Sequence, residues 1–262
     1  MREYKLLIGG KLVPGESTMT VVNPATGNVL SQCPRGSVAQ ADAAVAAAKG
    51  AFPAWSAKSH AERAAIVSKM ADAIEKNANE FATLLTQEQG KPTSEALPEI
   101  LGGAAFVRYY CSIDLPVEVI EDSETRRVET HRRPLGVVAA ITPWNFPFLL
   151  LVNKLAPALL AGNTVVAKPA PTTPLTTLML GELIADIFPA GVINFITDQN
   201  DLGGVLTRHP DVRKVSFTGS TATDRKVMAS AAESVKRVTL ELGGNDAAIV
   251  LPDAEPKKVA KG

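Results

Sequence analysis

The segment 212–242 constrains the fold of this chain more than any other part of the sequence. Residues 215–217 form a short extended run, a Gly-Ser turn follows, residues 221–232 are helix-forming, and residues 238–240 are extended again. A strand, a tight turn, a helix and a strand in this order predict two parallel strands joined by a helical crossover. Because parallel strands need helices on the faces of their sheet, the segment predicts an α/β fold.

The same segment carries a candidate anion site and a candidate catalytic carboxylate. Gly219 and Ser220 directly precede a helix, where free N–H groups and the positive end of the helix dipole favour a phosphate. Thr221 and Asp224 fit a capping box at that helix start. Glu241 ends the next strand, at the sheet edge where α/β proteins place their chemistry. The alternatives are that the Gly-Ser turn only caps the helix and that Glu241 is a solvated loop residue.

Strands and helices alternate from Leu135 to the end of the chain. The other strands are expected at 137–141, 164–167, 192–196 and 247–251, and the other helices at 148–160, 174–187, 202–208 and from 254 onward. The alternation predicts an open twisted sheet with helices on both faces. No GxGxxG motif follows any of these strands, so spacing alone gives weak support for a Rossmann fold.

The first 133 residues have a different pattern. A hairpin is expected around Gly9 and Gly10, followed by helices at 38–55, 60–76, 79–89 and 93–110, the last with Thr93 as a possible cap. In this helical segment we read Glu88 as solvated. Residues 116–133 alternate around a charged turn, which predicts a projecting β-hairpin. This hairpin is either a subunit contact or an ordinary exposed hairpin.

Composition excludes several classes of function. Lys+Arg and Asp+Glu are both 27, and this zero formal charge argues against nucleic-acid binding. No apolar stretch is long enough to cross a bilayer, and the N-terminus does not look like a signal peptide. Cys33 and Cys111 are the only cysteines and give neither a disulfide framework nor a metal-binding spacing. We therefore expect a cytoplasmic protein without membrane or nucleic-acid partners.

Two further blocks place polar groups at strand ends. The loop 141–147 is stiffened by two prolines, and the uncharged amide of Asn145 could stabilise an oxyanion, an effect worth roughly 3 kcal/mol per donor elsewhere. Lys168 ends a strand before Pro169 and could reach a ribose hydroxyl or a phosphate. The alternatives are an asparagine that holds its own loop and a solvated lysine.

The segments TPWNFP, LLAGNTVVAKP, VSFTGSTA and LELGGN, in this order, resemble the aldehyde dehydrogenase superfamily. The similarity runs from the N-terminal strands to Leu251. It implies an NAD(P)-dependent oxidoreductase that converts an aldehyde to a carboxylic acid, with a Rossmann-like sheet lacking GxGxxG. It also implies a discontinuous NAD(P)-binding domain at 1–115 and 134–262, and an oligomerisation hairpin at 116–133.

The resemblance implies a role for each matching position. Asn145 corresponds to the oxyanion-hole asparagine and Glu241 to the general base. The positions implied in binding NAD or NADP are Lys168 at the adenosine ribose, Gly219 and Ser220 at the pyrophosphate, Leu242 and Gly243 beside the nicotinamide, and Ile141, Thr142, Pro143 and Trp144 along the cleft.

The chain departs from the family pattern at three points. The family's nucleophilic cysteine follows the glutamate by a few tens of residues, but the sequence ends at Gly262 with no cysteine after Cys111. We therefore expect a cofactor-binding portion without the catalytic domain, inactive alone and prone to self-association or oligomerisation. Many members carry Glu at the position of Pro171, which leaves NAD and NADP both open. Asp224 replaces a common glycine and would either cap the helix or compete with the pyrophosphate.

Two other classes of function compete with this interpretation. The chain could be a nucleotide-binding or protein-interaction module without chemistry of its own. A hydrolase using Glu241 and Asn145 is a weaker option, because the sequence offers no nucleophile for it. The aldehyde itself cannot be read from these residues.

Overall fold

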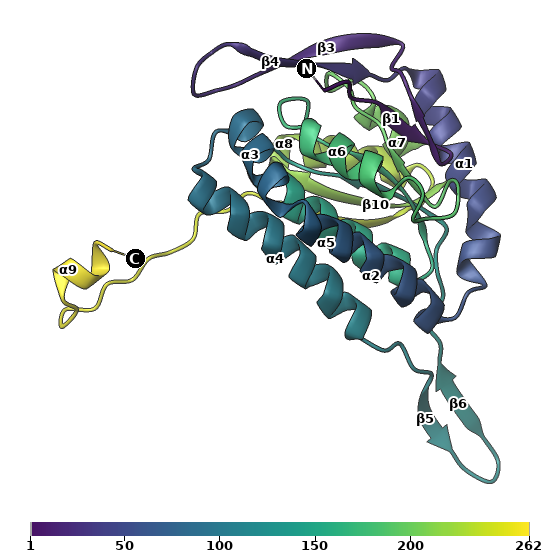
Figure 1. Ribbon diagram of the computed structural model, residues 1–262. Coiled ribbons are helices and arrows are strands. Elements are labelled where there is room, and N and C mark those ends of the chain that lie inside the picture. The colour runs from purple at the N-terminus through teal and green to yellow at the C-terminus, as the bar shows by residue number, and fades with distance from the viewer. Residues whose placement is uncertain (1, 262) are drawn as a thin grey trace.

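A seven-stranded sheet forms the centre of the protein in a computed structural model that describes residues 2–261 (Figure 1). The strand order is β11-β10-β7-β8-β9-β1-β2; the first five strands run parallel, and β1 and β2 are antiparallel additions at one edge. The strands are β1 (Leu6–Ile8), β2 (Lys11–Val13), β7 (Val137–Ile141), β8 (Thr164–Lys168), β9 (Ile193–Phe195), β10 (Val212–Gly219) and β11 (Arg237–Leu242).

Helices cover both faces of this sheet, because its central strands are apolar on both sides. In β7, Val138 and Ala140 pack into one hydrophobic cluster, whereas Val137, Ala139 and Ile141 pack into the other. On the first face, α5 (Pro147–Leu160) and α6 (Leu175–Ile184) lie against the sheet. Helices α2 (His60–Lys76), α3 (Ala78–Gln89) and α4 (Thr93–Ser112) pack against these two helices and complete the same hydrophobic cluster. The second face is covered by α1 (Val38–Ser56), α7 (Gly203–Arg208) and α8 (Thr221–Ala232).

Three segments lie outside this body. Strands β3 (Ser17–Val22) and β4 (Val29–Arg35) form a separate two-stranded ribbon. Strands β5 (Glu118–Asp122) and β6 (Arg127–Thr130) form the expected hairpin, which projects away from the helices in Figure 1. The last helix, α9 (Pro256–Val259), lies at the end of an extended segment that leaves the body. No helix of the described residues is long and apolar enough to cross a membrane.

The predicted order of elements is confirmed, with four local corrections. The strand expected at 247–251 is absent: Ile249 and Val250 are exposed, and no other strand lies beside this segment to supply hydrogen bonds. The N-cap of α4 is Pro92, not Thr93. The capping box at Thr221 is also wrong, because the N-cap of α8 is Ser220 and Thr221 is already the first residue of the helix.

Glu88 is the fourth correction, since it is buried and not solvated. Its carboxylate accepts hydrogen bonds from the N–H groups of Leu175 and Thr176 and from the Thr176 hydroxyl, and it thereby caps the start of α6. Burial raises the pKa of Glu88 to about 7 even though these three donors oppose the shift. A buried carboxylate at a helix start holds α3 and α6 together.

Candidate functional site

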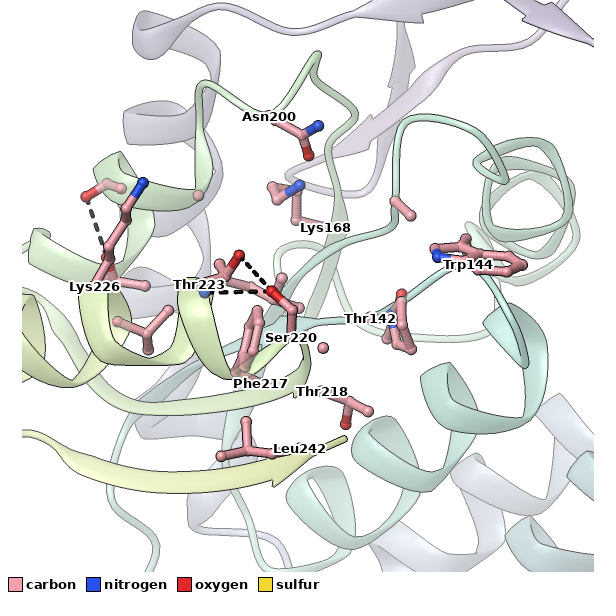
Figure 2. A pocket seen from close by; sticks show the side chains of 18 of the residues that line it. Thr142, Trp144, Lys168, Asn200, Phe217, Thr218, Ser220, Thr223, Lys226 and Leu242 are labelled. Atoms are coloured by element: carbon pink, nitrogen blue, oxygen red, sulfur yellow. Dashed lines mark hydrogen bonds between the residues drawn. The ribbon is translucent and has the colours of Figure 1, made fainter. Parts of the chain in front are cut away.

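A cavity of about 800 Å³ opens at the carboxyl ends of β7, β8, β10 and β11, beside the start of α8. Figure 2 shows side chains from these elements around the same space. All the predicted site residues except Glu241 line it: Ile141, Thr142, Pro143, Trp144, Asn145, Lys168, Gly219, Ser220, Leu242 and Gly243. The fold therefore brings together segments that lie far apart in the sequence, because the carboxyl ends of parallel strands share one edge of the sheet.

The turn before α8 and the first turn of this helix line the cavity through Gly219, Ser220 and Thr223. The Ser220 hydroxyl accepts the N–H of Thr223 at 3.3 Å, so one of the helix's free N–H groups is already satisfied (Figure 2). A Cβ atom built on Gly219 would lie 2.6 Å from Cζ of Phe217, so a larger residue at this exit from β10 would have to displace the Phe217 ring. Asp224 is buried, does not cap the helix through its side chain and does not line the cavity.

Lys168 is buried at the cavity wall and not solvated, contrary to the simpler interpretation of the sequence. Its Nζ lies 2.7 Å from Oδ1 of Asp198, and Oδ2 of Asp198 accepts the N–H of Leu202 at 2.8 Å. Asp198 follows β9 at the same edge of the sheet. Sequence reasoning missed Asp198, although its place just after a buried strand is the signal that could have indicated it.

The wall formed by the end of β7 contains an unpartnered polar atom. The Thr142 side chain is buried, and its Oγ1 has no hydrogen-bond partner within the described part of the chain. The Thr142 backbone N–H donates to Lys168 O at 3.1 Å, which joins the ends of β7 and β8. After it, Trp144 is 59% exposed and Asn145 is also exposed, so both side chains are available to a ligand.

Lys154 is a second residue that sequence reasoning missed. It lies on α5, is 8% exposed, and donates from Nζ to Ser216 Oγ at 3.2 Å and Thr218 Oγ1 at 2.8 Å. Burial lowers the pKa of Lys154 to about 8, and the Glu241 carboxylate partly opposes this shift. The signal was present in the sequence, because Lys154 is the only charged residue in a helix that is apolar apart from Asn153.

Glu241 lies on β11, the edge strand, opposite Thr218 of β10. Its side chain is exposed and does not line the cavity, although its neighbour Leu242 does. A Cβ atom built on Gly243 would meet nothing within 4 Å, so the chain is open to solvent here. This part of the site is therefore less enclosed than the part on β7 and β8.

Neither cysteine lies in the cavity. Cys33 is buried in β4, and burial raises the pKa of its thiol to about 12; burial also raises the pKa of the half-buried Cys111. A thiol with a raised pKa is a poor nucleophile, because the thiolate is the reactive form. Among residues 2–261, no cluster of side chains is suited to a metal ion.

The four motif segments and the cavity that they line have counterparts among known proteins. The sequence profile of the aldehyde dehydrogenase family matches residues 12–262. The chain belongs to the aldehyde dehydrogenase family.

Individual relatives agree with this assignment of the aldehyde dehydrogenase chain. A putative aldehyde dehydrogenase, FUS7 of Gibberella fujikuroi, is 42% identical over 253 residues, which are 97% of this chain and 55% of the relative. The phenylacetaldehyde dehydrogenase of Pseudomonas fluorescens is also 42% identical, over 99% of this chain and 55% of its own length. The chain thus spans about half the length of the curated relatives that it matches.

Solved structures show the same fold. A putative aldehyde dehydrogenase from Burkholderia cenocepacia has a TM-score of 0.95 at 40% identity, covering 100% of this chain and 55% of that one. The NAD+ complex of an aldehyde dehydrogenase from Bacillus cereus also has a TM-score of 0.95, at 38% identity and with the same coverage. The Rossmann-like sheet of this aldehyde dehydrogenase, with helices on both faces, is therefore the family fold, and the chain corresponds to about half of the full-length relatives.

Proposed function

We propose that this chain is the dinucleotide-binding part of an NAD(P)-dependent aldehyde dehydrogenase, which oxidises an aldehyde to a carboxylic acid. The observation that carries the proposal is the convergence of the family's motif segments on one cavity at the carboxyl edge of the sheet. A volume of about 800 Å³ is in the range of cofactor sites. The relative from Bacillus cereus was solved with NAD+ in place.

The residues present fit a dinucleotide. Lys168, Arg208 and Lys226 line the cavity, and no carboxylate of residues 2–261 does. Lys168 is paired with Asp198, so the net positive charge suited to a diphosphate comes from Arg208 and Lys226. The start of α8 adds backbone N–H groups, and the buried Thr142 hydroxyl offers a donor or acceptor that no other residue of 2–261 uses. The aromatic rings of Trp144 and Phe217 supply apolar walls for planar groups.

The proposed roles follow from these positions. A bound nicotinamide would accept a hydride from the substrate. The side-chain amide of Asn145 would donate a hydrogen bond to the substrate carbonyl oxygen as that oxygen becomes negative. Glu241 would take the proton from the hydrolytic water. Lys168, held by Asp198, would face the ribose, and Gly219 and Ser220 would face the diphosphate. Leu242 and Gly243 would lie beside the nicotinamide, with Ile141, Thr142, Pro143 and Trp144 along the cleft.

The thiolate for covalent catalysis would come from outside these residues. Cys33 and Cys111 lie away from the cavity, and the pKa of each thiol is raised. Because a carbonyl cannot form the thioester intermediate without a thiolate, we expect the isolated chain to bind the nucleotide without oxidising aldehydes. The competing function is a nucleotide-binding or interaction module without chemistry. It differs from the proposed function in that no partner segment would supply a thiolate to the bound nucleotide.

The cofactor is either NAD or NADP. Pro171 does not line the main cavity; it lines a neighbouring cavity of about 510 Å³, which shares Trp144 with the first. No carboxylate therefore lines the main cavity to repel a ribose phosphate. Isothermal titration with NAD and with NADP tests the proposal directly. Binding of at least one of them is expected, and the variant Gly219→Val, which fills the turn before α8, should abolish it.

Two outcomes would overturn parts of the proposal. Failure of both nucleotides to bind a folded sample would remove the cofactor role. Robust production of reduced nicotinamide from an aldehyde by this chain, followed by absorbance, would show that a nucleophile is present after all. A panel of short aliphatic and aromatic aldehydes suffices, because the proposal names no particular aldehyde.

The hairpin β5–β6 is proposed as a self-association surface in a homo-oligomer. Val117, Val119 and Ile120 are exposed there, at 49%, 47% and 60%. Exposed apolar side chains on a projecting hairpin favour contact with a second copy. Light scattering of the wild type and of Ile120→Lys tests this, and a wild-type monomer at high concentration would refute it.

A cytoplasmic location is proposed from the two unpaired cysteines alone.

A further inference from the structure

The loop between β7 and α5 carries Trp144 and Asn145 into the cavity, yet its own residues do little to fix it. Helix α5 starts at Pro147, and its N-cap, Phe146, makes no side-chain hydrogen bond to the first turn. The N–H groups at a helix start need acceptors, particularly when they are buried. Phe148 is fully buried, so its N–H group cannot rely on bulk water.

The acceptor comes from another helix. Glu99 of α4 accepts the N–H groups of Phe148 and Leu149 through Oε1, both at 3.1 Å. Its side chain is 1% exposed, so this carboxylate is removed from solvent. A carboxylate at a helix N-terminus is stabilised by the helix dipole and forms charge-assisted hydrogen bonds. Glu99 therefore caps α5 from across the helix layer.

Lys91 connects this carboxylate to the loop. It lies between α3 and α4, its side chain is 10% exposed, and its Nζ forms an ion pair with Oε2 of Glu99. The same ammonium group donates to the backbone carbonyl of Asn145 at 3.0 Å. It also lies 4.0 Å from the ring centroid of Phe146, a cation–π distance. One largely enclosed cation thus contacts the carbonyl of Asn145 and the ring that follows it.

We propose that Lys91 and Glu99 are positioning residues that fix the Asn145 peptide and thereby direct the side chains of Asn145 and Trp144 to the cavity. The benefit of this orientation rests on the proposed function, whereas the contacts of Lys91 and Glu99 do not depend on it. Neither residue lines the cavity, so neither touches a ligand. A capped helix needs only Glu99; the contact from Lys91 to the Asn145 carbonyl is what extends the cap to the loop.

The alternative is an ion pair that stabilises the helix layer and leaves the loop free. The double variant Lys91→Met with Glu99→Gln separates the two. The glutamine oxygen can still accept the N–H groups of Phe148 and Leu149, and no buried charge is left unpaired. Besides the ion pair itself, the losses are the donor to the Asn145 carbonyl and the cation beside Phe146. Glu99→Gln alone is the second variant, because it frees the lysine while keeping the cap.

The protein contains two tryptophans, which give a direct readout. With 15N-labelled tryptophan, one indole signal belongs to Trp55, which is 1% exposed and donates to Leu159 O, and the other to Trp144. The variant Trp144→Phe assigns them. In both Glu99→Gln and the double variant, we expect the Trp144 signal to shift or broaden while the Trp55 signal stays in place.

Dinucleotide affinity is the second measurement, and the double variant should weaken it about tenfold, the scale of one lost hydrogen bond. The matched control is Lys49→Met with Asp211→Asn, which removes an ion pair of 2.6 Å outside the cavity and should change neither readout. An unchanged Trp144 signal in either Glu99 variant, or equal shifts of both tryptophans, would overturn the positioning role. If the wild type binds no dinucleotide, the proposed function fails, whereas the tryptophan signals still decide this inference.

Discussion

The two sides of the cavity differ in how they are held. On β7 and β8, Ile141, Thr142 and Lys168 are buried, and Lys168 is fixed by Asp198. On β11, Glu241 and Leu242 are exposed and the strand pairs on one side only, with β10. The proposed cofactor-binding groups thus lie mostly on strands within the core, whereas the proposed base lies on an edge. The proposed nucleotide contacts therefore lie mainly on the side of the cavity that this chain holds firmly by itself.

The difference also explains why the buried side contains paired charges and the edge does not. A lysine in the core needs a partner, because its desolvation would otherwise be costly. Lys168 has Asp198, whereas Lys154, which lies below β10, has only hydroxyl acceptors and the nearby Glu241. Substitutions on each side should test this comparison.

The largest effect is expected at Lys168. Lys168→Met leaves the fully buried Asp198 carboxylate without its cation, which should lower the free energy of unfolding by about 3–5 kcal/mol. Adding Asp198→Asn should restore most of this loss, because the asparagine oxygen can still accept the N–H of Leu202. Urea denaturation of both variants measures it. A loss below about 1 kcal/mol for the single variant would mean that the β8 side is not held as described.

An intermediate effect is expected for Lys154 and depends on pH. The pKa of Lys154 falls from 10.5 in the unfolded chain to about 8 in the folded protein. Between these values the unfolded chain binds the proton and the folded protein does not, so stability rises as the pH rises. Relative to Lys154→Met, the wild type should therefore gain up to about 3 kcal/mol from pH 8 to pH 10.5.

Thermal or urea unfolding over this pH range measures the gain. Lys76→Met, at the exposed end of α2, is the control and should follow the wild-type profile. If Lys154→Met also follows the wild type, Lys154 is not desolvated beneath β10.

The smallest effect is expected at the edge. Glu241→Gln should change the free energy of unfolding by less than about 0.5 kcal/mol, because the side chain is exposed. Since the Glu241 carboxylate raises the pKa of Lys154, the substitution should lower that pKa further. An NMR titration of the lysine side-chain signals detects the shift. A large loss of stability would show that β11 is as firmly held as β8 and would remove the contrast between the two sides.

The sequence predicts the backbone of the site better than its charge network. Strand ends, the Gly219–Ser220 turn and the convergence of the motif segments follow from local patterns and from the geometry of parallel strands. The pairing of Lys168 with Asp198, and of Lys91 with Glu99, joins residues whose proximity depends on packing between distant elements. For the same reason Glu88 looked solvated, because only the position of α6 shows that its carboxylate is a cap.

The strand expected at 247–251 shows a different limit. Its sequence, AAIVL, has the composition of a buried strand, but a strand forms only where a neighbour supplies hydrogen bonds. In the described structure the sheet ends at β11, and Ile249 is 83% exposed. Local propensity was therefore a fair guide to what this segment could form, and the missing neighbour determined what it does form.

The ends of β7 and β8 line the cavity, and side chains of these two strands belong to both hydrophobic clusters. A molecule seated there cannot remain bound when those strands separate. Its binding free energy must then add to the free energy of unfolding of the whole body, and not only to the stability of one loop. A shift in melting temperature on adding a nucleotide would consequently serve as a binding assay that needs no chemical turnover.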